Sequence, residues 1–470
     1  MNRRISSLLA LLLLAGCAAG PDYRPPRDPA QQGYDLAALP AEERAGVPGP
    51  AMSGGAVPPD WWTLFRNAAL DQTERQAADD NATLAAAKAS LRQARQVVIE
   101  AQANWYPQIG LSAGVQRNGS GGFTAAGGGT SSDYFSLGPS ASYMLDLFGA
   151  TARSVEQSKA QADYQRWQVE EARLTLAGGI ATQAIAIASA RLQLRTAEDI
   201  LASDRKNLDM VRIQFEIGKA ARTDVLTAQA QLVGDQSQIA GLRQQLSVAR
   251  HALAVLMSRS PADWTPPDFA IADFAMPDSL PSSLPSSLVH QRPDIMAAES
   301  QLHSASAAIG IAAAQQYPQI TLSAGVTQQS VTPGGLLKSA NDLWNVGANL
   351  FQPIYQGGSL EAQRQAAIEA YQAQLETYRQ TVVAAFGQVA DSLRALEHDA
   401  ESLADARTSL DISTQSLELQ RASYQVGKTS LLQLLTAERS LNQAKQTMAT
   451  AQTQQLQDVV QFFLALGVTQ

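Results

Sequence analysis

The sequence has a single cysteine, Cys17, in 470 residues. A chain with one thiol can form neither an internal disulfide nor a metal site built from several cysteines. Its four histidines have no metal-ligand spacing. The run Gly127-Gly128-Gly129-Thr130 lacks the lysine of a phosphate-binding loop. We therefore expect no cofactor, no metal and no catalytic residues, and interpret the chain as not being an enzyme.

The chain also lacks a net positive charge and long apolar runs. Its formal net charge is −8, and becomes −10 when an N-terminal signal takes Arg3 and Arg4 away with it. A net negative charge of this size argues against nucleic acid as a partner. Beyond the signal, no apolar run reaches the roughly 18 residues of a transmembrane helix, which excludes one. Aromatic residues make up only 6%, whereas Ala, Gln and Leu are abundant, which favours long packed helices.

Residues 1–17 have the pattern of a secretory signal peptide. A basic start is followed by an apolar run, residues 5–14, that is too short to span a membrane. The run ends in Leu-Ala-Gly-Cys, which resembles the bacterial lipobox, so Cys17 is the predicted lipid attachment site, carrying diacylglycerol and palmitate. The alternative is an ordinary signal peptide that happens to contain a cysteine. Ala18 stands where Asp commonly retains lipoproteins in the inner membrane, and we therefore expect the outer membrane.

An internal duplication organises the rest of the chain. Residues 106–115 (YPQIGLSAGV) return as residues 317–326 (YPQITLSAGV), so Tyr106 and Tyr317 open two copies 211 positions apart. A match of this length at one offset predicts a duplicated unit of roughly 200 residues. Two copies of one element favour a symmetric structure over a single asymmetric catalytic cleft.

Proline and glycine mark the boundaries between the copies. Residues 18–60 predict an extended tether, and residues 258–291, with six prolines that forbid a long helix, predict a linker. The first structural repeat is then 61–257 and the second is 292–470. Each repeat is expected to contain a helix, two strands, a very long helix, a tight turn and a further helix.

Alternation of apolar and polar residues predicts two strands in each repeat. The expected strands are 107–117, 133–147, 318–329 and 342–355. Their lengths suit tilted membrane-spanning strands. A soluble sandwich alternates in the same way, but two hairpins make too few strands for its core. Pro139 cannot donate a ladder hydrogen bond, so we expect a local bulge there.

The two long helices are predicted at 150–215 and 358–424. At 1.5 Å per residue each is about 100 Å long, and leucine-rich heptads predict a coiled-coil seam along it. A second apolar stripe, at Ile217 in the first copy and at Leu419 in the second, lies on the opposite side of the helix. A helix with two opposite seams needs a neighbour on each side, like a stave in a barrel wall. An ordinary long coiled coil explains only one seam.

Several short motifs in this order resemble the outer-membrane factor (TolC-like) family, specifically its OprM/NodT-like lipoprotein subclass that serves RND-type tripartite efflux systems. The motifs are Leu14-Ala15-Gly16-Cys17, Gly20-Pro21-Asp22-Tyr23, Trp61-Trp62-Thr63-Leu64-Phe65, Leu145-Asp146-Leu147-Phe148-Gly149, Arg292-Pro293-Asp294-Ile295 with Glu299, and Pro353-Ile354-Tyr355-Gln356-Gly357-Gly358. The resemblance implies a mixed α/β membrane protein with four strands per chain. A homotrimer would close a 12-stranded β-barrel that continues into a long α-helical periplasmic barrel.

The same resemblance implies a function. The chain is expected to be a passive exit duct for drugs or other small molecules, as in multidrug resistance. Its partners would be a periplasmic adaptor (membrane fusion) protein and an inner-membrane RND transporter. A duct for type I protein secretion remains an alternative, because it uses the same kind of channel. A periplasmic adaptor lipoprotein is the less favoured alternative, because it would carry one helical hairpin inside β-rich domains.

Two groups of residues are candidate functional sites. The glycine-lysine turns, within 216–222 and 425–430, are predicted to form the periplasmic tip that docks the adaptor, through Gly218, Lys219, Gly427 and Lys428. The family resemblance further implies an aperture gate just inside the tip, at Asp224, Thr227, Thr436, Glu438 and Arg439. Exposed ion pairs contribute only about 0–1 kcal/mol each, which suits a latch that must reopen. Arg439 is the main candidate, with Asp224 as its partner across helices, whereas Glu438 has the alternative of being a solvated helix charge.

Overall fold

The computed structural model describes residues 19–27, 51–53, 58–120, 130–277, 279–281, 290–336, 338 and 342–467. Cys17, the signal peptide, most of the tether and the glycine-rich run from 127 lie outside the described residues. The chain separates into two compact units. Unit 1 comprises Met1–Arg27, Ala89–Arg166 and Ala297–Arg379, and unit 2 comprises Asp28–Lys88, Trp167–Met296 and Gln380–Gln470.

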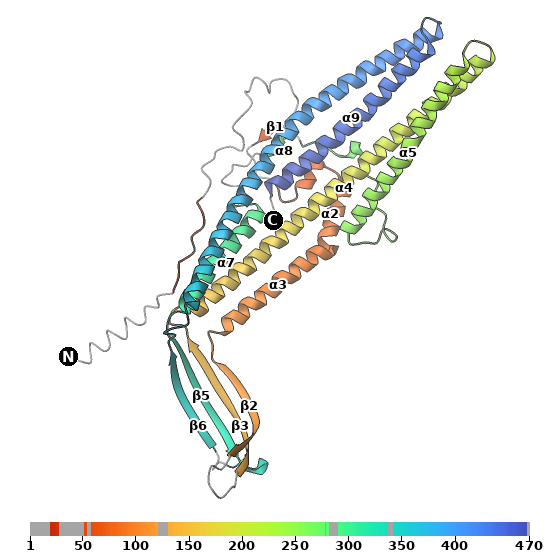
Figure 1. The fold of residues 1–470 in the computed structure, drawn as a ribbon. Helices are drawn as coiled ribbons and strands as arrows, with labels where there is room; N and C mark the ends of the chain where they lie inside the picture. The colour runs from red at the N-terminus through yellow and green to blue at the C-terminus, as the bar shows by residue number, and fades with distance from the viewer. Residues whose placement is uncertain are drawn as a thin grey trace. The chain divides into compact units, whose positions relative to one another are not determined.

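Unit 1 contains one four-stranded antiparallel sheet in the order β2-β3-β5-β6 (Figure 1). Its strands are β2 (Gln108–Ser120), β3 (Thr130–Leu145), β5 (Gln319–Ser330) and β6 (Asp342–Phe351). Each copy of the duplication supplies one hairpin, and the copies meet at β3 and β5, where Ala141 lies opposite Ala324. The prediction of four strands per chain is therefore confirmed. Strand β2 also runs on past its expected end at residue 117.

Strands β3 and β6 end earlier than their sequence patterns indicate. Asp146 is the first residue after β3. Its carboxylate accepts hydrogen bonds from the backbone N–H groups of Thr151 and Ala152, at 3.0 and 2.8 Å. These are orphan donors of the first helical turn, so Asp146 starts the following helix instead of extending the strand. Strand β6 ends two residues before Pro353, which has no N–H to donate.

The bulge expected at Pro139 is absent, and that prediction is wrong. Pro139 lies opposite Leu111 in an unbroken β2–β3 register. Towards β5 the ladder lapses at residues 138 and 139, yet the pairs on either side keep the same register. Gly138 explains how the strands stay close without an inserted residue. A Cβ at that position would lie 2.0 Å from the Val326 carbonyl oxygen.

Seven helices belong to the described residues outside the short 3-10 turns. They are α2 (Ala68–Asp80), α3 (Ala82–Ala103), α4 (Ala150–Glu216), α5 (Arg222–Leu256), α7 (Pro293–Ala314), α8 (Ser359–Gln425) and α9 (Leu431–Leu466). Helices α4 and α8 have 67 residues each, about 100 Å, and contribute to both units. Among the described helices, none is apolar over a sufficient length to cross a membrane.

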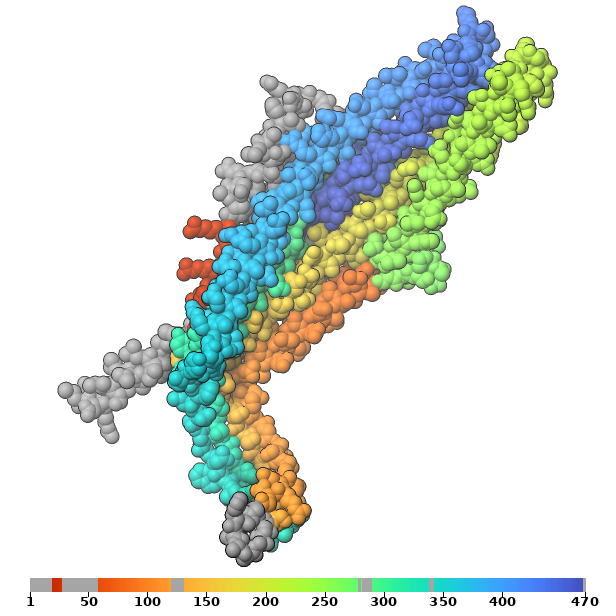
Figure 2. Space-filling view, in the orientation of Figure 1, coloured from red at the N-terminus to blue at the C-terminus, as the bar shows by residue number. Residues whose placement is uncertain are grey.

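Within unit 2, α4 pairs with α5 and α8 pairs with α9 to form two long helical hairpins. The predicted heptad seams supply the contacts, with Leu208 of α4 against Val225 of α5 and Leu417 of α8 against Leu434 of α9. Figure 2 shows the α8–α9 hairpin in blue directly beside α4 in yellow, and the Ser189 and Thr453 hydroxyls join α4 to α9 at 2.9 Å.

The second apolar stripe of each long helix stays exposed in the protomer. Ile217 on the first hairpin and Ile412, Leu419 and Val426 on the second are all more than half exposed, whereas Met210 of the predicted stripe is half-buried. These side chains face away from the hairpin partner that buries the first seam. A row of large exposed aliphatic side chains on both hairpins indicates a surface that another molecule covers.

Aromatic side chains form the core at the other end of unit 2. Trp61, in the 3-10 turn Trp61–Phe65, stacks on Phe463 of α9 with ring centroids 5.3 Å apart. Two short strands also belong to unit 2, β1 (Ala51–Ser53) and β4 (Ser279–Pro281), and they pair in parallel. The predicted tether and the predicted linker thus contribute one strand each to a two-stranded sheet.

The Arg292-Pro293-Asp294 motif joins three helices of unit 2. The buried Arg292 guanidinium binds Asp294 at 3.0 and 2.6 Å and the Gln388 side chain of α8 at 2.8 Å. It also donates to the carbonyl of Ala465, near the end of α9. A planar guanidinium satisfies several acceptors at once, which an ammonium on a flexible stem does less well.

Candidate functional site

The two glycine-lysine turns have the same backbone geometry. Gly218 and Gly427 both have φ of +74°, the left-handed conformation that ends a helix at little cost only in glycine. The next N–H closes each turn, from Lys219 to the Gln214 carbonyl at 2.7 Å and from Lys428 to the Ser423 carbonyl at 2.9 Å. The duplication therefore preserves the hairpin ends as well as the strands.

The predicted docking residues lie on the surface of these turns. Lys219 and Lys428 are exposed, and a Cβ at either turn glycine would meet no atom within 4 Å. The glycines are therefore required by backbone conformation, and space beside them is open for a partner. A hydrogen bond of 2.6 Å from the Tyr424 hydroxyl to Gln214 Oε1 joins the two hairpins just behind the turns.

Three of the five gate candidates make local hydrogen bonds on their own helices. Asp224 accepts from the backbone N–H of Ala221 at 2.8 Å and so caps the start of α5. The hydroxyls of Thr227 and Thr436 donate to carbonyls one turn earlier, at 2.9 and 2.7 Å. Within the chain the structure thus does not bring Asp224 to Arg439. An Asp in the first turn stabilises the helix N-terminus, and this capping role holds its carboxylate.

Glu438 is buried, with 6% of its surface exposed. Its carboxylate accepts from the Asn207 amide of α4 and forms an ion pair with Arg421 of α8 at 3.3 Å. Burial raises the pKa of Glu438, while the hydrogen bonds and charge of Arg421 and the bond from Asn207 lower it in part. The alternative that Glu438 is a solvated helix charge does not hold in the protomer. It links α9 to both long helices.

Arg439 makes a hydrogen bond to a side chain of α5. Its Nε donates to Gln231 Oε1 at 2.6 Å, and this contact is exposed. A glutamine pair, Gln446 with Gln238 at 3.5 Å, makes a second α9–α5 contact two turns away. The main gate candidate is therefore held by an exposed hydrogen bond from a charged guanidinium to an uncharged amide, and water or another acceptor can replace that amide.

A pair of carboxyl groups, of which one is buried, lies beside Glu438 and Arg439. Asp204 of α4 is 5% exposed and lies beside the carboxyl of Asp235 on α5. Burial raises the pKa of Asp204 to about 7, and the hydrogen bond and negative charge of Asp235 and the charge of Glu438 add to this rise, while Arg439 opposes it. Asp204 Oδ2 has no hydrogen-bond partner among the described residues. The second hairpin has its own pair, in which burial and a bond to Asp458 raise the pKa of Asp399 to about 7.

Sequence reasoning missed Asp204, although a signal was present. Its position continues the buried seam of α4 that includes Leu201 and Leu208. An Asp in the middle of an apolar heptad stripe is costly unless it is protonated or paired. The partners could not be named in advance, because the rotation of α5 against α4 decides which of its side chains meets the seam.

The polar contacts behind the turns join all four helices of the two hairpins. Ionisable and amide side chains from α4, α5, α8 and α9 meet behind the turns through contacts that protonation or exchange of partners can alter. In the part of the chain that the structure describes, no group of three or more His, Cys, Asp or Glu side chains is arranged to hold a metal ion.

Comparison with known proteins agrees with this arrangement. The chain is 29% identical to nodulation protein T of Rhizobium leguminosarum bv. viciae, over 98% of this chain and 93% of that protein. It is 29% identical to the pyoverdine export outer membrane protein OpmQ of Pseudomonas aeruginosa, over 99% of this chain and 96% of the relative. The solved outer-membrane channel OprN superposes with a TM-score of 0.87 at 24% identity, covering 96% of this chain and 99% of OprN.

The family model for outer membrane efflux proteins matches twice, at residues 74–259 and 284–468. Each match falls on one copy of the duplication and together they span most of the chain. The resemblance seen in the sequence motifs is thereby confirmed. The chain belongs to the outer membrane efflux protein family, whose members are channels and not enzymes.

Proposed function

We propose that three copies of this chain form a closed channel that serves as the outer-membrane exit duct of a tripartite efflux pump. The observation that carries the proposal is the open sheet of unit 1. Among the described strands, β2 and β6 each have one neighbour, so each presents an unpaired edge. In a bilayer every backbone group needs a partner, so a sheet can span it only when closed. Three such sheets joined at these edges supply twelve strands and leave a lumen.

The side chains of the sheet support a membrane position. Ile109, Leu111 and Val115 on β2 and Trp344 and Val346 on β6 are more than two-thirds exposed in the protomer. Apolar side chains at alternate positions of an edge strand are unfavourable in water and favourable against lipid. The exposed second seams on both helical hairpins support the same symmetry, because neighbouring chains would cover them.

The remaining assignments follow from this assembly. Once the signal peptide is cleaved, Cys17 carries the lipid that anchors each chain to the outer membrane. Six glycine-lysine turns, two per chain, form the periplasmic tip, where Gly218, Lys219, Gly427 and Lys428 meet a periplasmic adaptor protein. The adaptor connects the duct to an inner-membrane RND transporter. Asp224, Thr227, Thr436, Glu438 and Arg439, with the carboxyl pairs behind them, control the aperture.

Small molecules are the proposed cargo. The relative OpmQ is named for pyoverdine export, and the matching family is named for efflux. Deleting the gene should raise the sensitivity of the host to small toxic compounds and leave its secreted proteins unchanged. Purified protein should have the mass of a trimer and conduct ions in planar bilayers. A monomer without conductance would refute the duct, and loss of a secreted protein would favour type I secretion.

A further inference from the structure

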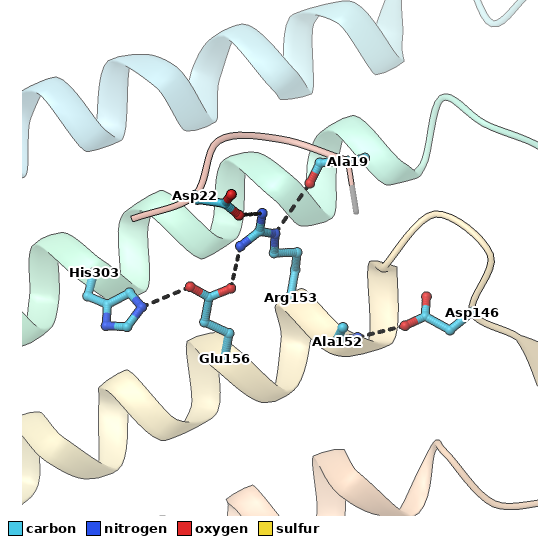
Figure 3. A network of polar contacts seen from close by, with 7 residues as sticks. All are labelled: Ala19, Asp22, Asp146, Ala152, Arg153, Glu156 and His303. Atoms are coloured by element: carbon cyan, nitrogen blue, oxygen red, sulfur yellow. Dashed lines mark hydrogen bonds and ion pairs between the residues drawn. The ribbon is translucent and has the colours of Figure 1, made fainter. Parts of the chain in front are cut away.

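The N-terminal segment Ala19–Tyr23 is seated on unit 1 between α4 and α7, around a buried arginine (Figure 3). The Arg153 side chain is 7% exposed. Its guanidinium donates to the Ala19 carbonyl at 3.3 Å, to the Asp22 carboxylate at 2.7 Å and to the Glu156 carboxylate at 2.7 Å. Two of these three partners belong to the segment. Without the segment, the guanidinium would keep only Glu156 of these three partners.

The aromatic ring of the segment has partners of its own. Tyr23 stacks on His303 of α7, with ring centroids 4.2 Å apart, and its hydroxyl donates to Glu299 at 3.3 Å. Burial raises the pKa of Tyr23, and the nearby Glu299 carboxylate adds to the rise, so the hydroxyl keeps its proton and remains a donor. His303 in turn lies 2.8 Å from Glu156, which connects the ring to Arg153 in one network.

Two glycines allow the segment to approach this closely. Gly20 has φ of +87°, and a Cβ there would lie 2.4 Å from the Cα of Gly310 on α7. A Cβ on Gly310 would lie 2.7 Å from Arg153 Cγ and 3.0 Å from the Ala19 carbonyl oxygen. The backbones of the segment and of α7 are therefore in direct contact at these two glycines, and the surface of α4 and α7 is complementary to this segment.

The segment has a defined direction on unit 1. The Ala19 N–H donates to the Phe148 carbonyl at 2.8 Å, at the junction between strand β3 and helix α4. Tyr23 lies at Glu299 and His303, whereas Gly20 lies at Gly310, nearer to the strand that follows α7. From Tyr23 back to Ala19, the segment thus runs towards the sheet.

Exposed aromatic side chains gather at these same strand–helix junctions. Trp105 and Tyr106 precede β2, Tyr317 precedes β5 and Tyr355 follows β6, and all four are exposed. Phe148 stacks on Tyr317 at 4.7 Å. Aromatic side chains of this kind line the membrane–water interface of barrel proteins.

We infer that the site around Arg153 is a clamp that holds the N-terminal segment so that a lipid on Cys17 enters the membrane at the level of these aromatic side chains. The two residues from Cys17 to Ala19 span at most about 7 Å, so the anchor cannot move far from the junction. Arg153 is the positioning residue of the clamp. The statement about the lipid rests on the proposed lipidation, whereas the seating of the peptide does not.

The test uses a nitroxide label on full-length protein in nanodiscs. Cys17 is the only cysteine, so once it is lipidated a thiol introduced by Arg24→Cys, at an exposed position just after the clamp, is the only labelling site. We expect an immobilised electron paramagnetic resonance spectrum. Adding Arg153→Ala should shift the ratio of docked to released segment at least about tenfold, because two charge-assisted hydrogen bonds to the segment are lost.

A second variant and a matched control keep the test decisive. Asp22→Asn removes a charge from a side chain that is 89% exposed, so it cannot unfold unit 1, and it should mobilise the label in the same direction. Arg166→Ala on the same helix removes a half-exposed arginine paired with Asp163 at 3.8 Å and should change nothing. Equal spectra with and without Arg153, or an equal response to Arg166→Ala, would overturn the clamp.

The position of the lipid anchor is tested by measuring how deeply nitroxide labels lie in the membrane. A label on Pro21→Cys and one on Tyr106→Cys should show the same headgroup depth in power saturation against oxygen and a nickel chelate. A Pro21 label in bulk solvent would overturn the membrane part of the inference. Intact mass reports lipid on Cys17, and bilayer conductance reports the duct, so a failure of the proposed function is distinguishable from a failure of the clamp.

Discussion

Replacing Asp204 with Asn should remove a pH-dependent loss of stability from the α4–α5 hairpin. In the folded chain the Asp204 carboxyl is buried against Asp235, with Glu438 and Arg439 as the other charged groups facing it. In the unfolded chain the same carboxyl is in water. In Asp204→Asn the side-chain amide has nearly the same shape as the carboxyl, can still donate a hydrogen bond towards Asp235, and does not titrate in this range.

The sign follows from proton binding. The pKa of Asp204 rises from its ordinary 3.8 to about 7, so between these values the folded state holds a proton that the unfolded state releases. The free energy of unfolding therefore falls as pH rises through this window, by about 1.4 kcal/mol per pH unit. Across the window the free energy of unfolding of the wild type falls by about 4 kcal/mol per chain through this group. In Asp204→Asn this group contributes no such fall.

The assay is guanidinium unfolding of the purified protein, followed by helical circular dichroism, at steps from pH 4 to pH 8. The relevant quantity is the difference between Asp204→Asn and wild type at each pH, which cancels other titrating groups. It should move in favour of the variant up to about pH 7 and then level off. Asp209→Asn, on the same helix with a side chain 71% exposed, is the control and should give a flat difference.

A flat difference for Asp204→Asn would refute the raised pKa of Asp204. It would mean that water reaches the carboxyl in solution, or that an assembled neighbour supplies a cation. A difference that grows in favour of wild type at high pH would show that the Asp204 carboxylate is stabilised instead, which reverses the sign of the argument.

Four further predictions concern other parts of the chain. Cys17→Ala should abolish palmitate labelling while the trimer is retained, because barrel closure and not the acyl chains satisfies the backbone; unlabelled wild type would contradict lipidation. Bulky substitution at Gly218 or Gly427 should weaken crosslinking to the adaptor without unfolding the trimer, and unchanged crosslinking with unchanged efflux would leave only a structural role. Arg439→Ala should raise the resting conductance in planar bilayers, and a conductance equal to wild type would remove it from the gate. Arg292→Ala should cost about 2–4 kcal/mol in unfolding, because it leaves the buried Ala465 carbonyl unpaired and removes the bonds to Asp294 and Gln388; a change below 0.5 kcal/mol would contradict this.

Local chemistry made much of the fold predictable. Strand alternation, heptads and the two turn glycines each depend on neighbours a few residues away, and the duplication allows one copy to check the other. The failures occur where one segment meets another. At Pro139 the missing donor was foreseen, but Gly138 lets β5 approach without a bulge. At residues 51–53 a short strand was missed because its partner lies more than 200 positions away.

The candidate site divides in the same way. The sequence alone determined the position of the turns at Gly218 and Gly427, because positive φ is a local demand on a single residue. It also determined that the chain is built twice. Only the tertiary structure decided that Asp224 caps its own helix, that Glu438 is buried against Asn207, and that Arg153 holds the N-terminal segment. The physical reason is that hydrogen bonds and burial depend on the rotation and spacing of packed helices, which periodicity restricts to a face but does not resolve to a partner.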